Sequence, residues 1–147
     1  MSQKTVLVPT GINVVFDLTQ AKLQWGRSGL QARADFIAKN PNTVLAVVAA
    51  TLLAQNSMFA DTTTATSKFA EFAQVKPDAA ALAMNAFLGY GSRSMLFTAD
   101  AFTAPRDVLG TVNPAMANVD VATCFDLSFL NKLKDNCFYA KNSIPLN

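Results

Sequence analysis

The residue types that most often carry out acid–base and nucleophilic catalysis are scarce in this chain. Its 147 residues include no histidine, and Glu71 is the only glutamate. Histidine is the commonest general base, so its absence excludes Ser–His–Asp and Cys–His catalytic arrangements. The aspartates are scattered along the chain and lack the spacing of a calcium-binding loop. We therefore expect no catalytic site, no metal site and no cofactor, and we expect a protein that is not an enzyme.

The two thiols, Cys124 and Cys137, lie 13 residues apart in a segment that we predict to be helical. On one continuous helix they would be about 20 Å apart along the axis, whereas a disulfide needs Cα atoms within about 7 Å. Two cysteines without histidine also cannot supply a four-ligand zinc site from nitrogen and sulfur. We expect two buried free thiols, which suits a reducing compartment.

One glycine-rich segment, Gly89-Tyr-Gly-Ser-Arg-Ser94, has the composition of an anion-binding loop. It lacks the spacing of a phosphate-binding P-loop, and it follows a predicted helix where a P-loop follows a strand. We interpret it as the turn that ends this helix. Anion binding by Arg93 and the backbone amides is the alternative.

Four basic residues fall within one predicted helix, namely Lys22, Arg27, Arg33 and Lys39. At 100° per residue, Arg27 lies about 140° from Lys22 and Arg33 about 120° from Arg27, so they do not form one stripe. The simpler interpretation is four solvated charges on a surface helix. Lys22, Arg27 and Arg33 are the candidates for contact with nucleic acid, although a net charge of +2 does not by itself imply such a partner.

The elements that would position these residues begin with two β-branched segments near the N-terminus. Residues 5–8 and 12–18 have strand-like composition, and Pro9-Thr10-Gly11 between them supplies turn residues. This pattern predicts an N-terminal β-hairpin over 4–18.

A helix is predicted over 19–40, and Pro41 ends it because proline disfavours helix in the residue before it. The following stretch, 44–54, is apolar all round except for Thr51. Such a helix is either central in a core or within a membrane. Its length of about 16 Å is roughly half the hydrocarbon thickness of a bilayer. We predict a buried core helix, with a membrane segment over 43–60 or a subunit-interface helix as alternatives.

Residues 61–67 are rich in aspartate, threonine and serine, and predict a polar loop. Phe69 and Phe72 then share one face of a short predicted helix. A further helix is expected to start at Pro77, a favoured first helical residue, and to end at Gly89, a usual place for a left-handed terminator.

Glycines and prolines punctuate residues 89–118, which predicts a long irregular arm with a strand at 95–98. Loops of this length are uncommon inside compact domains and tend to be functional. After the arm, Asp120 is expected to cap one amphipathic helix that reaches Cys137.

Together these elements predict a single domain over 1–147 that is mainly α with an N-terminal β-hairpin, and therefore an α+β fold. It would hold about four to five helices and a long irregular arm. Its predicted parts are the hairpin at 4–18, a helical core at 19–88, the extended arm at 89–118, and the C-terminal helix and tail at 119–140.

The composition favours interfaces over chemistry. Charged residues make up 15% of the chain, against roughly 25% in an average soluble domain. Because charges normally cover the surface, a good part of this surface is expected to face something other than water. We expect a self-assembling structural subunit of a virus particle, such as a capsid protein, or of a tubular assembly. Its partners would be copies of itself or other assembly subunits.

The chain has eleven phenylalanines, and several of them crowd the arm and the last helix. Enrichment in aromatic residues beside depleted lysine and glutamate is typical of the core of an interface. Phe97, Phe102 and Phe129 are therefore the candidate interface residues.

Three alternatives stay open. The chain could be a small membrane-associated protein that uses 43–60, an intracellular protein-binding adaptor, or an enzyme or ligand-binding protein whose aspartates or thiols converge only in the fold. We weigh the membrane less than self-assembly. Residues 1–9 lack the pattern of a secretory signal, so we expect the protein in a virion or the cytoplasm rather than secreted by a signal peptide.

Overall fold

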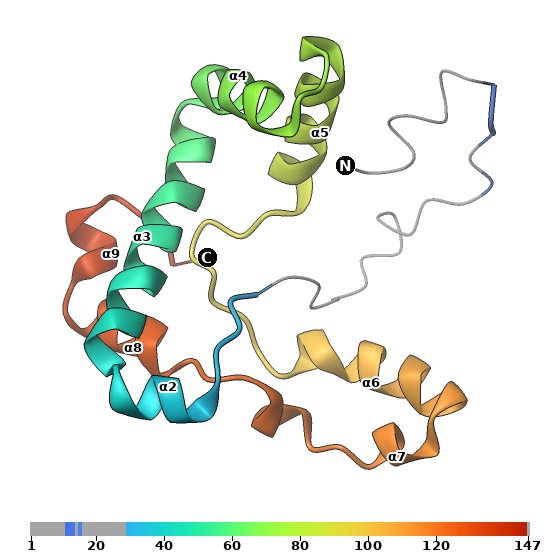
Figure 1. Ribbon diagram of the computed structural model, residues 1–147, viewed down its shortest axis with the longest axis vertical. Coiled ribbons are helices and arrows are strands. Elements are labelled where there is room, and N and C mark those ends of the chain that lie inside the picture. The colour runs from blue at the N-terminus through green and yellow to red at the C-terminus, as the bar shows by residue number, and fades with distance from the viewer. Residues whose placement is uncertain (1–10, 14, 16–28, 147) are drawn as a thin grey trace.

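The computed structural model of the protein describes residues 11–13, 15 and 29–146, and every regular element in this part of the chain is a helix (Figure 1). Eight are α-helices and one, η3, is a short 3₁₀-helix. In chain order they are α2 (Ala34–Lys39), α3 (Pro41–Ala60), α4 (Thr62–Ala73), α5 (Pro77–Tyr90), α6 (Asp100–Val112), α7 (Pro114–Ala117), η3 (Val121–Cys124), α8 (Ser128–Asp135) and α9 (Phe138–Lys141).

The α+β prediction is therefore wrong for the described residues, which contain no strand. The predicted hairpin at 4–18 lies outside them except for 11–13 and 15. The predicted strand at 95–98 is irregular chain. Its backbone is turned locally instead, because the hydroxyls of Ser92 and Ser94 accept hydrogen bonds from the N–H groups of Met95 and Leu96.

The predicted irregular arm is mostly helical, and the residues that suggested irregularity help to build a helical hairpin. Pro114 is the first residue of α7, and the side chain of Asn113 accepts a hydrogen bond from the N–H of Ala115. A Cβ at Gly110 would lie 3.0 Å from the Cβ of Ala117, so the glycine lets α7 approach α6 closely. Pro105 lies inside α6, where proline is usually excluded.

Two prolines mark helix starts. The helix before Pro41 was predicted to reach Asn40 and ends one residue earlier, at Lys39, and Pro41 itself opens α3. Pro77 opens α5 as predicted, but Gly89 lies inside that helix rather than ending it. Of the predicted helix at 19–40, the described part is helical only from Ala34.

Two further predictions fail because capping side chains redirect the backbone. Residues 61–67 form the start of α4 rather than a loop, since the Asp61 carboxylate accepts a hydrogen bond from the N–H of Thr64. The single C-terminal helix is three helices, η3, α8 and α9. Asp120 caps the first as predicted, and Asp126 accepts from the N–H of Ser128 at the start of the second.

The main core gathers where α3 meets the C-terminal segment. Leu52, Leu133, Tyr139 and Ile144 are buried there, with Phe138 packed against them. A smaller contact joins α5 to α4, with Ala80 and Met84 buried. The prediction that α3 is a buried core helix is wrong, because Leu52 is its only fully buried residue. The described residues that pack around this helix are too few to cover its apolar surface.

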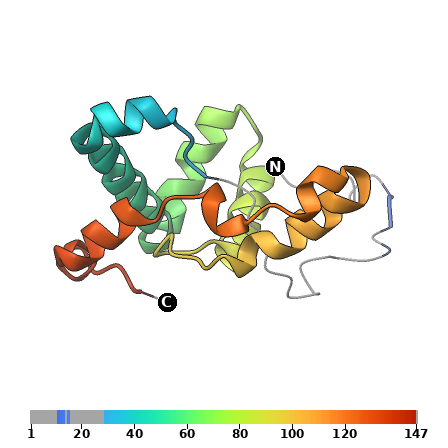
Figure 2. The ribbon, with the colours of Figure 1, turned by 90° about the horizontal axis from the view of Figure 1, so that it is seen from below.

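We call two parts of the molecule the base and the arm. The base comprises residues 29–60 and 128–146, with α2, α3, α8 and α9. From here on, the arm comprises residues 97–127, with α6, α7 and η3, in place of the predicted segment 89–118. The two lie on opposite sides of the molecule in both views (Figures 1 and 2).

Candidate functional site

Two grooves formed by the described residues offer no arrangement for acid–base chemistry. One, of about 420 Å³, lies between α4 and α5 and is lined mainly by small, hydroxyl and amide side chains such as Thr62, Thr66 and Asn85. Another, of about 480 Å³, lies between α3 and α4, and its ionisable residues are Asp61 and Lys68. The described residues contain no group of three or more side chains that could hold a metal ion.

The aspartates mostly serve local structure. Hydrogen bonds from the backbone and side chain of Thr64 hold the pKa of Asp61 below its usual value. Asp120 and Asp126 bond backbone N–H groups at helix starts. Asp107 pairs with Arg106, with 2.7 Å between Nη2 and Oδ1. These roles stabilise helix starts and local turns.

Both cysteines are free, and both are exposed. The prediction that they are buried is therefore wrong. The helix that would have turned them into the core is interrupted at 125–127. Cys137 stands in the left-handed region, with a φ of 57°, immediately before α9.

Two of the three candidate interface phenylalanines meet at the root of the arm. The Phe97 ring centroid lies 5.5 Å from that of Phe102 and 4.8 Å from that of Phe125, and Phe102 stacks on Phe125 at 5.3 Å. The arm begins at Phe97 and ends shortly after Phe125, so these three rings hold its first and last residues together. Phe129, in α8, has no ring contact with them in the described structure. Contact of these residues with another copy stays a prediction.

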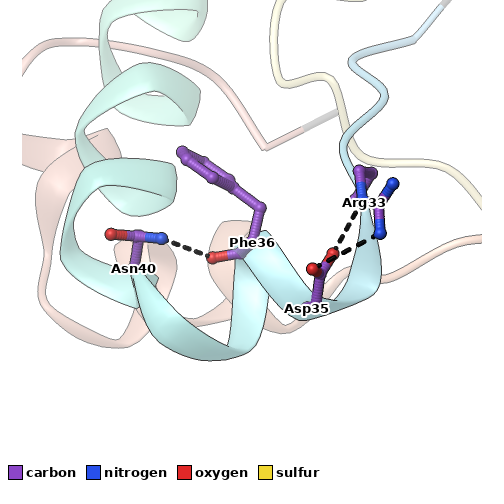
Figure 3. Close-up of polar contacts among 4 residues, drawn as sticks. All are labelled: Arg33, Asp35, Phe36 and Asn40. Carbon is purple, nitrogen blue, oxygen red and sulfur yellow. Dashed lines mark hydrogen bonds and ion pairs between the residues drawn. The ribbon is translucent and has the colours of Figure 1, made fainter.

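Of the candidate nucleic-acid contacts, only Arg33 lies within the described residues. Its guanidinium turns back onto Asp35 at the start of α2, with 3.0 Å between Nε and Oδ1 (Figure 3). At the other end of α2, the side-chain amide of Asn40 donates to the carbonyl of Phe36. Lys22 and Arg27 fall outside the described part of the chain, so contact of these three residues with nucleic acid stays a prediction.

The segment 89–94 is fastened to α3. Arg93 donates from Nε and Nη2 to Oδ1 of Asn56, at 3.1 and 2.8 Å, and its guanidinium lies 5.6 Å from the centre of the Phe59 ring. The Tyr139 hydroxyl donates to the carbonyl of Ser94 at 2.8 Å, and burial raises the pKa of this tyrosine. Arg93 therefore serves here as a fastening between α3 and the chain that leads into the arm.

No family model, curated protein or solved structure matches this chain significantly.

The most distinctive surface is the exposed side of α3. Residues 46, 47, 50, 53 and 54 are all exposed, and at 100° per residue they span about 120° of the helix circumference. All five are alanine, valine or leucine. Among the described residues, α3 is the one helix long and apolar enough to cross a membrane, judged by length and composition alone, with a mean hydropathy of 1.6.

A second apolar face lies on α6 of the arm and was missed by the sequence reasoning. Val108, Leu109 and Val112 are exposed, and they lie within about 100° of one another around the helix. Their spacing of one and four residues is a helical signal. The glycines and prolines of 89–118 outweighed it, so the region was interpreted as irregular.

Proposed function

We propose that the chain is a non-catalytic structural subunit that assembles with copies of itself, as a building block of a virus particle or a tubular assembly. The observation that carries the proposal is the exposure of α3, a 20-residue apolar helix that buries only Leu52 completely. A helix that is apolar all round is normally covered. Contact with further copies would cover it.

The energetics favour burial of more than one face per interface. Burying a valine or leucine side chain contributes roughly 1.5–3 kcal/mol. Association costs roughly 4–15 kcal/mol in lost freedom of motion. The exposed valine and leucine of α3 are already about half buried, so alone they would not offset that cost. Adding the three residues of α6 brings the gain to about 4–8 kcal/mol when their partial burial in the single chain is counted. This gain meets only the lower end of the cost, so a stable interface must also bury the exposed alanines of α3.

The viral form of the proposal rests on composition. Small, alanine- and threonine-rich chains with few charges and no catalytic histidine suit a protein whose surface is largely covered by its neighbours. Expression in a host cell, followed by electron microscopy of the purified material, tests this form. Particles or tubes support it, and discrete small oligomers contradict it.

The test of self-assembly is the mass of the protein in detergent-free buffer, measured by light scattering after size-exclusion chromatography at two salt concentrations. We expect a discrete mass well above the 15.7 kDa of one chain. A monomer at every concentration tested would contradict the proposal.

Membrane association is the second candidate, because α3 has the length and composition of a membrane span. Its C-terminal half argues against a spanning role. Gln55 donates to the carbonyl of Ser92, and Asn56 binds Arg93, so insertion would draw a guanidinium towards the bilayer interior or break these bonds. Co-flotation with lipid vesicles and a need for detergent would favour the membrane. Solubility without detergent and no flotation would exclude this role.

A further inference from the structure

We propose that the copies associate head to tail, with the arm of one copy docked on the base of the next. This inference rests on the proposed function, because it names the two surfaces and the geometry through which the subunit would assemble. The exposed face of α6 in one copy would thus contact the exposed face of α3 in a second copy of this chain.

The arm offers a compact apolar surface at its far end. Val108 is 54% exposed and Val112 is 80% exposed, with Leu109 between them on α6. The other side of this helix is occupied, since Gly110 lies against Ala117 of α7. The apolar face therefore points away from the arm's own packing and is free to meet another molecule.

The base offers the matching apolar surface. The exposed face of α3 runs along the helix through Ala46, Val47, Ala50, Leu53 and Ala54. Small side chains dominate it, so a second helix could lie close against it. The larger side chains of α6 would then pack into the shallow depression that the alanines leave between Val47 and Leu53.

Charge selects the arm as the partner of the base. The base carries five basic and two acidic residues, a net charge of +3. The arm carries one basic and four acidic residues, a net charge of −3. The segment between them, 61–96, has three of each sign and is neutral. The basic residues of the base are Arg33, Lys39, Lys132, Lys134 and Lys141, and the acidic residues of the arm are Asp100, Asp107, Asp120 and Asp126.

The two parts that carry these apolar surfaces have opposite net charges, which favours contact between unlike ends. Base against base and arm against arm would each place like charges together, which is unfavourable. Within one chain the base and the arm lie on opposite sides of the molecule (Figures 1 and 2), so they can contact different neighbours. Such a contact is heterologous and produces a ring if it closes or a helical filament if it does not.

The test uses two variants of the full chain that each remove one surface. The arm variant carries Val108→Glu and Val112→Glu, which place charges on its apolar face and add to the negative charge of the arm. The base variant carries Val47→Lys and Ala50→Lys, which place charges on the apolar face of α3 and add to the positive charge of the base. All four side chains are exposed, so circular dichroism should match the wild type. Leu82→Glu, at a 51% exposed position on α5 outside both surfaces, is the matched control.

We expect each variant alone to have the mass of one chain, and the control to assemble like the wild type. An equimolar mixture of the two variants should give a complex of two chains and nothing larger. In this complex the intact arm of the base variant binds the intact base of the arm variant. The substituted arm and the substituted base cannot bind a further chain.

Other outcomes are distinguishable. A monomeric wild type overturns the proposed function itself. An assembling wild type whose two variants also assemble overturns only the head-to-tail contact. Two monomeric variants whose mixture stays monomeric also overturn it, because the intact arm of one variant then fails to bind the intact base of the other. If the base variant does not fold, Ala46→Lys, at another exposed position of the same face of α3, replaces it, with the same expected mixture.

Discussion

The base and the arm are both helical, yet they are held together in different ways. The base has five buried residues, namely Leu52, Leu130, Leu133, Tyr139 and Ile144. The arm, from 97 to 127, has no fully buried residue and is closed by three phenylalanine rings at its root. Local stability follows buried apolar contact, so the base should open only with the whole fold and the arm should open by itself.

This difference bears on the proposed assembly. A part of a protein that buries little on its own gains most from a partner that covers it. The arm would therefore be ordered more firmly in the assembly than in the single chain, whereas the base would change little. Substitutions in each part test whether the arm and the base differ in stability.

The largest effect is expected from Leu52→Ala in the base. This side chain is fully buried among the core residues, so its truncation should lower the free energy of unfolding by about 2–5 kcal/mol. The measurement is urea unfolding followed by circular dichroism. Leu53→Ala removes the same atoms from a 40% exposed neighbour and should cost less than about 1 kcal/mol. Equal losses would show that α3 does not pack as described.

Phe125→Ala should loosen the arm and leave the base intact. The substitution removes two ring contacts, each contributing about 0.5–1.5 kcal/mol beyond burial, at the point where the arm closes. Limited proteolysis should then cut within 100–124 at a higher rate, while urea unfolding of the base shifts little. Phe129→Ala, outside the ring cluster, serves as the comparison. Unfolding of both parts together would contradict a separately opening arm.

Tyr139→Phe should have a smaller effect, confined to the base. It removes the hydrogen bond to the carbonyl of Ser94 and should cost about 1 kcal/mol at neutral pH. Burial raises the folded-state pKa of Tyr139, so its contribution is present below the unfolded pKa of about 10 and is lost as pH rises through the folded pKa. Wild-type stability should therefore fall more steeply above about pH 10 than that of the variant. Parallel pH profiles would argue against this burial.

Gly110→Ala should have the smallest effect and reports how tightly the arm is packed. Alanine is favoured over glycine in a helix by about 1 kcal/mol, and the added Cβ must push Ala117 away by a few tenths of an ångström. Because α7 is only four residues long, we expect it to shift and the two effects to nearly cancel. Thermal unfolding of the variant should match the wild type within a few degrees. A large loss would mean that the arm is as rigid as the base.

Helices that rest on local signals could be predicted from the sequence. Pro77 opens a helix as predicted, and Asp120 caps one. The burial of α3 could not be predicted, because an all-apolar sequence does not say how many neighbours will surround it. The arm was misjudged because Pro105 and Gly110 usually interrupt helices. Here the first is tolerated in α6 and the second lets α7 approach.

The candidate site was predicted only in part. The prediction that Phe97, Phe102 and Phe129 contact another copy stays a prediction. Within the chain, Phe97 and Phe102 pack against Phe125, a cluster that the concentration of phenylalanines did not specify. The exposed faces of α3 and α6 could not be placed before the helices were known. Exposure depends on which side of each helix its neighbours cover, and no single sequence window contains that information.

Hydrogen exchange of the full chain at low and at high protein concentration tests most directly whether the arm makes the contact between copies. We predict that the amides of α3 and α8 are protected at both concentrations. The amides of α6 should exchange quickly in the dilute protein and become protected as copies assemble. Exchange in α6 that is independent of concentration, in a sample whose mass shows assembly, would contradict the claim that the arm makes the contact.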